Sequence, residues 1–279
     1  MLKKKLQHLL RRLGAYDRLR ESFAYDCYRR LRHGRPLRWR HDELLFYRTL
    51  LAGAPEGLLV FDVGAHRGQR SEVFLRLGAR VVAVEPDALN QRHLERRFSL
   101  GGPHARPVTV VGKAASDTDA GAVLRIHAPG SGLNSLSEKW VRMLAGDERR
   151  FGSTVAFPEG MRVETTTLES LMDAFGAPYY VKIDVEGHEP SVLRGLKRPV
   201  PFLSFEVNLP EFLPEGAACA EELGRLSATG RFNWAGDPLR GLAMTEWLDA
   251  PEFARALREC GEPSVEVFWK SGQDAVADR

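Results

Sequence analysis

The densest group of chemically active side chains follows an apolar run in the segment PYYVKIDVEGHE, residues 178–189. Asp184 and Glu186 are two residues apart, so they share one face of an extended backbone. The glycine after them permits a turn, and His188 and Glu189 begin the next predicted helix. Carboxylates and an imidazole this close together repel or compete, which stability alone does not favour. We therefore expect a catalytic site here, with Asp184 and Glu186 as the first candidates for a general base and His188 as an alternative.

Two other roles stay open for these carboxylates. Glu186 or Glu189, taken singly, could cap the following helix. The group also offers the hard oxygen ligands that magnesium prefers. The four candidate metal ligands are Asp184, Glu186, Glu189 and Glu206. Because the sequence does not show that their oxygens converge, a divalent metal is not expected.

A glycine turn in VFDVGAHRGQ is the second chemical signal. A buried strand is expected to end at Asp62, and a helix to open near Gln69. Gly64 and Gly68 let the backbone turn sharply and approach a ligand closely, and the helix N-terminus presents free N–H groups. Glu85, 21 residues after Gly64, ends the next predicted strand. An acid there can accept hydrogen bonds from both ribose hydroxyls of an adenosine cofactor, so this order of elements predicts a nucleoside site.

The kind of cofactor follows from what the turn lacks. Dinucleotide-binding turns carry G-x-G-x-x-G, whose middle glycine makes room for a pyrophosphate, whereas this chain has G-A-H-R-G. Asp62 suits a ligand with an ammonium group and would repel a diphosphate. S-adenosylmethionine has an amino-acid tail and an adenosine but no phosphate, so it is the predicted cofactor. The missing glycine disfavours a nicotinamide-dependent oxidoreductase, and a tight turn with no ligand is the structural alternative.

A parallel sheet would bring these two clusters together, and the pattern after residue 55 predicts one. Short β-branched runs alternate with helical patterns, as in parallel βαβ units. Strands are expected at 58–63, 80–84, 107–111, 179–184, 201–207, 231–235 and 264–270. Helices are expected near 69–77, 87–97, 167–175, 189–196, 217–228 and 246–258. Ligands bind at the carboxyl ends of such strands, so we predict a doubly wound α/β domain with a mostly parallel seven-stranded sheet.

Two further segments stand apart from this pattern. The stretch 129–160, with clusters of Gly, Pro and Ser and a helical pattern around 137–145, is predicted to be a lid or insertion. Residues 1–40 hold 13 Lys and Arg against three Asp and Glu, and leucines recur on one helical face. We expect residues 1–50 to form a basic amphipathic helical extension of an enzyme domain over 51–279. Its leucines could pack on that domain or a partner subunit, or the helix could lie on an anionic membrane surface; nucleic acid is disfavoured.

The composition is that of an ordinary globular protein, with 43% apolar and 28% charged residues. The three cysteines are far apart and form no C-x-x-C, so neither a disulfide framework nor a zinc site is expected. No apolar stretch reaches the roughly 20 residues of a membrane-spanning helix. The sequence therefore predicts a cytoplasmic protein, peripheral at the inner face of a membrane if the basic extension binds lipid.

The run from Val163 to Asn208 resembles the signature of the FkbM-type methyltransferases. Its "K-I-D-V-E-G-x-E-x-x-V-L-x-G" element is present at 182–195, after a "T-L-x-x-L" element and before a strand that ends in Glu206. The family's "D-V-G-A-x-x-G" element matches residues 62–68, and its "E-P" element matches Glu85 and Pro86. The resemblance implies a class I, Rossmann-like methyltransferase fold that uses S-adenosylmethionine.

The resemblance also implies O-methylation of a saccharide or secondary-metabolite hydroxyl, with a small molecule or glycan as acceptor. The predicted cofactor-binding residues are Asp62, Gly64, Ala65, His66, Gly68, Glu85, Pro86, Ala114 and Ser116. Two positions depart from the family pattern: Gly112 stands where Asn is frequent, and Asn134 replaces the first serine of a Ser-rich loop. A non-catalytic protein that keeps the fold to bind S-adenosylmethionine or to act as a scaffold is the alternative from another class.

Overall fold

A computed structural model of the chain describes residues 35–99, 108–146 and 155–272. The chain divides after Leu50 into two compact units. In the first unit the described part is the helix α4, Arg35–Leu50, and the leucine-rich start of the chain lies outside the described residues. None of the described helices is long and apolar enough to cross a membrane. The membrane contact and the cytoplasmic location stay predictions.

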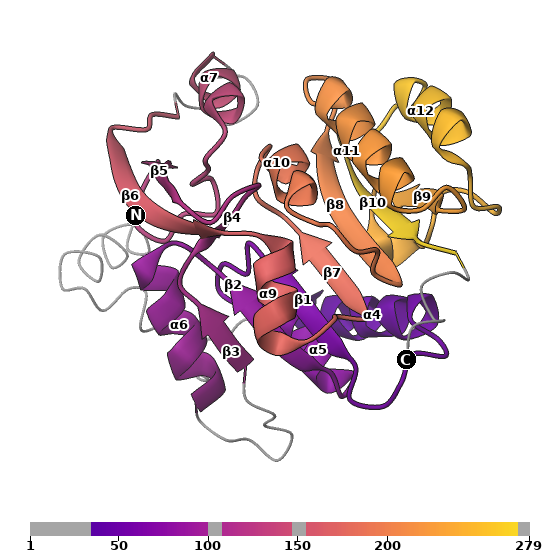
Figure 1. Cartoon of the computed structure of the whole chain (residues 1–279), viewed down its shortest axis with the longest axis horizontal. Coiled ribbons are helices and arrows are strands. Elements are labelled where there is room, and N and C mark those ends of the chain that lie inside the picture. Colours follow the sequence, from indigo (N-terminus) through magenta and orange to yellow (C-terminus); the bar gives the residue numbers. More distant parts are fainter. Residues whose placement is uncertain (1–34, 100–107, 147–154, 273–279) are drawn as a thin grey trace. The chain divides into compact units, whose positions relative to one another are not determined.

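The second unit is built on one seven-stranded sheet in the order β3-β2-β1-β7-β8-β10-β9 (Figure 1). The strands are β1 Leu59–Val63, β2 Arg80–Val84, β3 Val108–Val111, β7 Tyr180–Ile183, β8 Phe202–Asn208, β9 Arg231–Ala235 and β10 Ser264–Lys270. All neighbours are parallel except that β10 runs antiparallel to both β8 and β9. The prediction of a mostly parallel seven-stranded sheet is confirmed.

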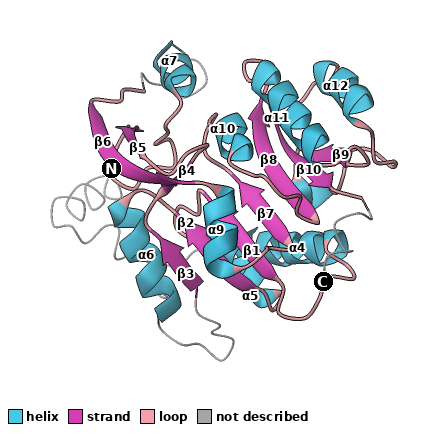
Figure 2. Cartoon of the chain, viewed as in Figure 1, coloured by secondary structure: helices cyan, strands magenta, loops and turns pink. Residues whose placement is uncertain are grey.

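The helices of this unit follow the strands in alternation (Figure 2). They are α5 Gln69–Arg76, α6 Ala88–Ser99, α7 Glu138–Gly146, α9 Leu168–Phe175, α10 Glu189–Arg194, α11 Leu213–Leu226 and α12 Ala250–Arg258, with a 3-10 turn at Pro238–Arg240. The helix predicted from 246 begins four residues later, because Asp249 and Glu252 form a reciprocal capping box there. The helix predicted from 217 begins earlier, at Leu213, with a proline in its first turn.

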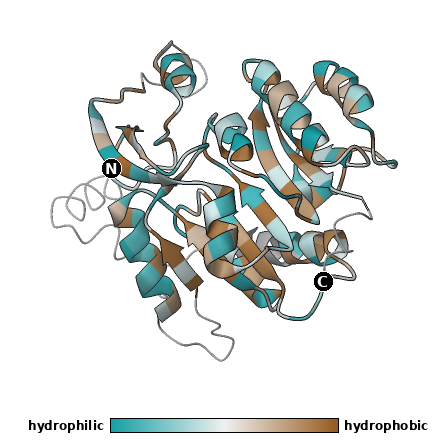
Figure 3. Ribbon diagram, in the orientation of Figure 1, coloured by the Kyte–Doolittle hydropathy of each residue, from teal (hydrophilic) through white to brown (hydrophobic). Residues whose placement is uncertain are grey.

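Helices cover both faces of the sheet, so the unit is doubly wound. On one face, Asp62 of β1 accepts a hydrogen bond from Ser71 of α5, and the ring of Tyr180 in β7 lies edge-on to that of Phe74 with centroids 5.5 Å apart. On the other face, alternate residues of the same strands form the large core. The side chains that α9, α10, α11 and α12 bring to this core include Leu171, Val192, Leu223 and Phe253. Figure 3 shows the hydrophobic colour on β1 and β2 and a largely hydrophilic α6.

A second, small sheet was not predicted. It has the order β4-β6-β5, with β4 Ala114–Ala115, β5 Gly121–Ile126 and β6 Glu159–Thr166. Most residues of β5 and β6 are exposed or half-buried, so glycines and charges interrupt the apolar pattern by which strands are recognised. The predicted insertion at 129–160 thus contains α7 and runs into the first residues of β6.

Candidate active site

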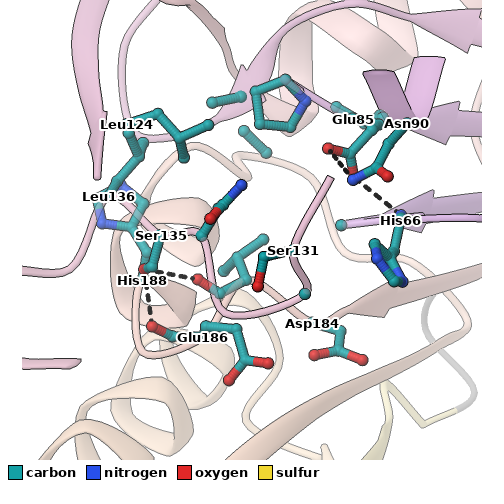
Figure 4. A pocket seen from close by; sticks show the side chains of 18 residues that line it. His66, Glu85, Asn90, Leu124, Ser131, Ser135, Leu136, Asp184, Glu186 and His188 are labelled. Carbon is teal, nitrogen blue, oxygen red and sulfur yellow. Dashed lines mark hydrogen bonds between the residues drawn. The ribbon is translucent and has the colours of Figure 1, made fainter. Parts of the chain in front are cut away.

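A pocket opens at the carboxyl ends of β1, β2 and β7 (Figure 4). Its empty volume, including the solvent at its mouth, is about 560 Å³. The polar residues that line it are His66, Glu85, Asn90, Ser131, Asn134, Ser135, Asp184, Glu186 and His188. Three turns that are far apart in the sequence therefore meet around one cavity. They are the glycine turn after β1, the E-P turn at Glu85 and Pro86, and the turn at residues 184–189, called the acidic turn here.

The predicted cofactor residues divide into two groups. Those that line the pocket are Gly64, His66, Glu85, Pro86 and Ala114, and those that do not are Asp62, Ala65, Gly68 and Ser116. The carboxylate of Asp62 faces the hydroxyl of Ser71 in α5, and burial raises the pKa of Asp62. In this structure Asp62 therefore ties the end of β1 to α5 and does not line the pocket. Its contact with the cofactor's ammonium group stays a prediction.

Gly64 brings two strand ends together. Its φ is +80°, and a Cβ there would lie 1.8 Å from the carbonyl oxygen of Asp184. Gly68 (φ +74°) lets the start of α5 approach α6 closely, since a Cβ would lie 2.7 Å from side-chain atoms of Leu94 and Phe98 in α6. Both glycines are required by close approach of the chain itself, in addition to any approach of a ligand.

Glu85 is held at the pocket wall by three donors. The N–H of His66 donates to Oε2 at 2.8 Å, and Asp87 N and Asn90 Nδ2 donate to Oε1 at 2.9 and 3.3 Å. Burial raises the pKa of Glu85 to about 7, although these hydrogen bonds favour the charged form. Asn90 Oδ1 is buried without a hydrogen-bond partner among the described residues. A carboxylate and an open amide acceptor side by side fit the hydroxyl donors of a ribose.

Asp87 and Asn90, which were not predicted from the sequence, organise the pocket around Glu85. Asp87 Oδ1 accepts from Leu89 N at 2.8 Å at the start of α6, while Oδ2 accepts from Gly130 N at 2.8 Å. Asn134 Nδ2 donates to the same Oδ2 at 3.1 Å, which accounts for this departure from the family's serine. The available signal was an acid followed three residues later by an amide, directly after the E-P element.

The other departure also has a local reason. A Cβ on Gly112 would lie 2.9 Å from the side-chain oxygen of Gln91. The amide nitrogen of Gln91 donates to the carbonyls of Glu85 and Pro86 at 3.0 and 3.1 Å. Gln91 therefore fills the space beside residue 112 and braces the backbone that carries Glu85.

The acidic turn and strand β8 bring three of the predicted carboxylates together. One oxygen from each of Asp184, Glu186 and Glu206 lies within 4.8 Å of the others, a spacing that a single cation could bridge. Lys182 Nζ lies 2.8 Å from Asp184 Oδ2. Burial opposes the charge on Asp184, but Lys182, the charge of Arg70 and a hydrogen bond with Glu206 together lower the pKa of that carboxyl.

Burial and the charge of Asp184 raise the pKa of Glu186 well above its ordinary value. The same two causes raise the pKa of Glu206 to about 7. The predicted fourth metal ligand, Glu189, is outside this group. Its Oε1 accepts from Val185 N at 3.1 Å, so it organises the turn, and burial raises its pKa to about 8.

His188, the third candidate base, is a neutral imidazole at physiological pH. Burial lowers its pKa to about 4, and its Nε2 lies 3.1 Å from Ser116 Oγ. A group that binds protons so weakly accepts one from a hydroxyl poorly. The three candidate bases thus differ in pKa: it is lowered in Asp184, raised in Glu186 and lowered in the neutral imidazole of His188.

The strand order and this site define a class I S-adenosylmethionine-dependent methyltransferase. The methyltransferase FkbM domain family matches residues 62–226, more than half of the chain, and the protein belongs to that family. The cofactor is S-adenosylmethionine, as predicted. No curated protein matches the chain.

Three solved structures are similar in fold. Precorrin-6y C5,15-methyltransferase from Geobacter metallireducens is 14% identical, with 82% of this chain and 84% of that chain covered and a TM-score of 0.38. A TehB-like SAM-dependent methyltransferase from Corynebacterium glutamicum is 11% identical, with 84% and 95% covered and a TM-score of 0.40. The plantazolicin methyltransferase BpumL, in complex with SAH, is 6% identical, with 89% of each chain covered and a TM-score of 0.41.

Proposed function

We propose that this methyltransferase methylates a hydroxyl oxygen of a neutral acceptor, a saccharide or a secondary metabolite, and that Glu186 accepts the hydroxyl proton. One observation carries the proposal: Glu186 lies at the pocket wall beside the ionised Asp184, and burial together with that charge raises the pKa of Glu186. A general base works best when its pKa lies near the operating pH. An ordinary carboxylate is too weak a base for this task, whereas one beside a fixed negative charge is stronger.

Bound S-adenosylmethionine supplies a methyl group that its sulfonium already activates, so the protein mainly aligns the acceptor and removes a proton. Glu85 and Asn90 would hold the ribose, and the turn at Gly64 would face the amino-acid tail. Lys182 keeps Asp184 ionised, and Asp184 in turn holds up the pKa of Glu186. Glu186 takes the proton as charge develops on the acceptor oxygen.

The charge at this end of the pocket supports a neutral hydroxyl acceptor. Asp184 and Glu186 line that end, and Asp184 is ionised, so a phosphate or carboxylate on the acceptor would be repelled. Carboxylates accept hydrogen bonds from hydroxyl groups well. A polyhydroxylated acceptor therefore fits the site better than a phosphorylated one.

The test is Glu186→Gln, assayed by S-adenosylhomocysteine release with a panel of neutral saccharides and their phosphorylated counterparts. We expect turnover of a neutral acceptor to fall by about 10²–10⁴-fold, with cofactor affinity retained. Glu164→Gln is the matched control, because that side chain is 74% exposed and outside the pocket. Full activity of Glu186→Gln, or a labelled methyl group on nitrogen or carbon, would overturn the proposal.

A chelator separates the base from a metal held by the same carboxylates. If Glu186 acts as the base, EDTA leaves wild-type turnover unchanged. Loss of turnover in EDTA, restored by added magnesium, would assign the carboxylates to a cation instead.

A further inference from the structure

Residues 127–137, between β5 and α7, cross the pocket and are called the strap here. Its side of the pocket lining consists of Ser131, Gly132, Asn134, Ser135 and Leu136. Figure 4 shows Ser135 next to the acidic turn, while Glu85 and Asn90 lie at the other end of the cavity. The strap therefore touches both the cofactor end and the acidic end of the site.

One end of the strap is fixed to the elements around Glu85. Gly130 N and Asn134 Nδ2 both donate to Asp87 Oδ2, and His66 Nε2 lies 3.0 Å from the carbonyl oxygen of Gly130. Asn134 Oδ1 also accepts from His127 N at 2.9 Å, which ties the strap to itself. The cofactor end of the strap is thus hydrogen-bonded both to Asp87 and within itself.

The other end is fixed to the acidic turn through the buried Ser135. Its Oγ is placed to donate to the carbonyl oxygens of Glu186 and Val185, at 2.8 and 3.2 Å, and accepts from Ser137 N at 2.9 Å. The backbone of Ser135 exchanges two hydrogen bonds with Arg125 of β5, at 2.9 and 3.2 Å. The backbone of Ser135 is therefore fixed to β5, while its side chain is hydrogen-bonded to the backbone of the acidic turn.

The backbone of the acidic turn is strained, so it requires hydrogen bonds from neighbouring segments to keep its conformation. Glu186 has φ +55°, in the left-handed region that residues with a Cβ rarely adopt, and Gly187 follows with φ +88°. Such conformations persist only where surrounding contacts hold them. Ser135 holds the carbonyl side of this turn, while Glu189 accepts from the amide of Val185 on the other side.

We propose that Ser135 is a positioning residue: it fixes the backbone of Glu186, aims that carboxylate into the pocket, and links cofactor binding to the order of the acidic turn. This inference rests on the role proposed for Glu186. It predicts that binding at the Glu85 end steadies the strap, and that the steadied strap slows opening of residues 184–189.

The first test is hydrogen–deuterium exchange of the full-length protein with and without S-adenosylhomocysteine. In wild type, bound S-adenosylhomocysteine should slow exchange in residues 184–189. Ser135→Ala should bind it within about threefold of wild type, yet exchange in the turn should be about tenfold faster and no longer respond to binding. Ser135→Thr keeps the hydroxyl and should restore the response. Turn exchange unchanged in Ser135→Ala would overturn the proposal.

Ser137→Ala is the matched control. It is the same change two residues along the chain, and Ser137 Oγ accepts from Trp140 N at 3.2 Å at the start of α7. This variant should lose protection in α7 and keep the response of the turn. If both alanine variants lose protection in the turn equally, Ser135 has only a general structural role.

The second test is a double-mutant cycle on turnover. Ser135→Ala should slow wild type by about 10- to 100-fold, and add no further loss in the Glu186→Gln background, because both changes remove one function. Multiplied losses would show that Ser135 acts without Glu186. If Glu186→Gln alone keeps full activity, the proposed function fails, whereas the exchange experiment still decides whether Ser135 orders the turn.

Discussion

The pH dependence of cofactor binding tests the role of Glu85. Burial raises its pKa to about 7 in the free protein, so near neutral pH about half of the molecules carry a protonated carboxyl. Ribose hydroxyls donate to the carboxylate, and a protonated carboxyl has lost part of its capacity to accept. Binding should therefore draw on the ionised fraction and release a proton.

The size of the effect follows from that pKa. The ionised fraction is about ten elevenths at pH 8 and about one eleventh at pH 6, so affinity should fall about tenfold between them. Below pH 6 the loss should approach tenfold for each further unit. Because the ionised form of Glu85 binds the ribose, affinity for the cofactor increases as pH rises through the pKa of Glu85.

Calorimetry of S-adenosylhomocysteine binding between pH 6 and 8.5, repeated in buffers of different ionisation enthalpy, measures both affinity and proton release. His66 and His188 stay neutral in this range because burial lowers their pKa, and Asp184 stays ionised because Lys182 and Arg70 lower its pKa. The pKa values of Glu186, Glu189 and Glu206 are raised, so the comparison with Glu85→Gln is needed to separate their contribution from that of Glu85. Glu85→Gln should bind more weakly by about 1–3 kcal/mol at pH 8 and lose the roughly tenfold change in affinity between pH 6 and 8 that Glu85 causes. A flat wild-type profile, or a pH dependence in Glu85→Gln as steep as that of wild type, would refute the reasoning.

Two further predictions concern the glycine turn and the basic segment. Gly64→Ala should lower the free energy of unfolding by more than about 3 kcal/mol, since its Cβ would lie 1.8 Å from a carbonyl oxygen; Gly78→Ala, with φ +86° and open space, should cost about 1 kcal/mol. Equal denaturation midpoints for the two variants would contradict this account. If residues 1–40 bind an anionic membrane surface, their deletion should abolish sedimentation with anionic liposomes, and rising salt should weaken it in the intact chain. A truncated chain that still sediments would locate the contact elsewhere.

The glycine turn and Glu85 could be placed from sequence because their positions depend on local rules. A strand that ends in a glycine turn and a second strand that ends in an acid must meet at one edge of a parallel sheet. Gly64 and Glu85 accordingly line one pocket. The acidic turn followed for the same reason, since β7 is paired directly with β1.

The strap could not be placed in this way. Its position depends on hydrogen bonds of Asp87 and Ser135, which lie 43 and 51 residues from their partners Gly130 and Glu186. No periodic pattern encodes such contacts, and β5 and β6 lack the continuous apolar run of the central strands. The orientation of Asp62 was equally hidden, because it depends on a hydroxyl that one turn of α5 presents.

The acidic cluster shows where this fold gives up stability. Burial raises the pKa values of Glu85 and Glu206 to about 7 and of Glu189 to about 8, so the native state holds more protons than the unfolded chain above the ordinary value of 4.5. Each of these groups therefore opposes folding increasingly as pH rises through that window. Apolar side chains at these positions would avoid the cost. Glu85 lines the pocket, whereas Glu189 and Glu206 line a second, smaller cavity that Gly187 of the acidic turn also lines. The cost is therefore concentrated around the two cavities that the acidic turn lines, where Glu186 also adopts a strained backbone. Chemistry on a bound ligand requires such groups, and packing does not.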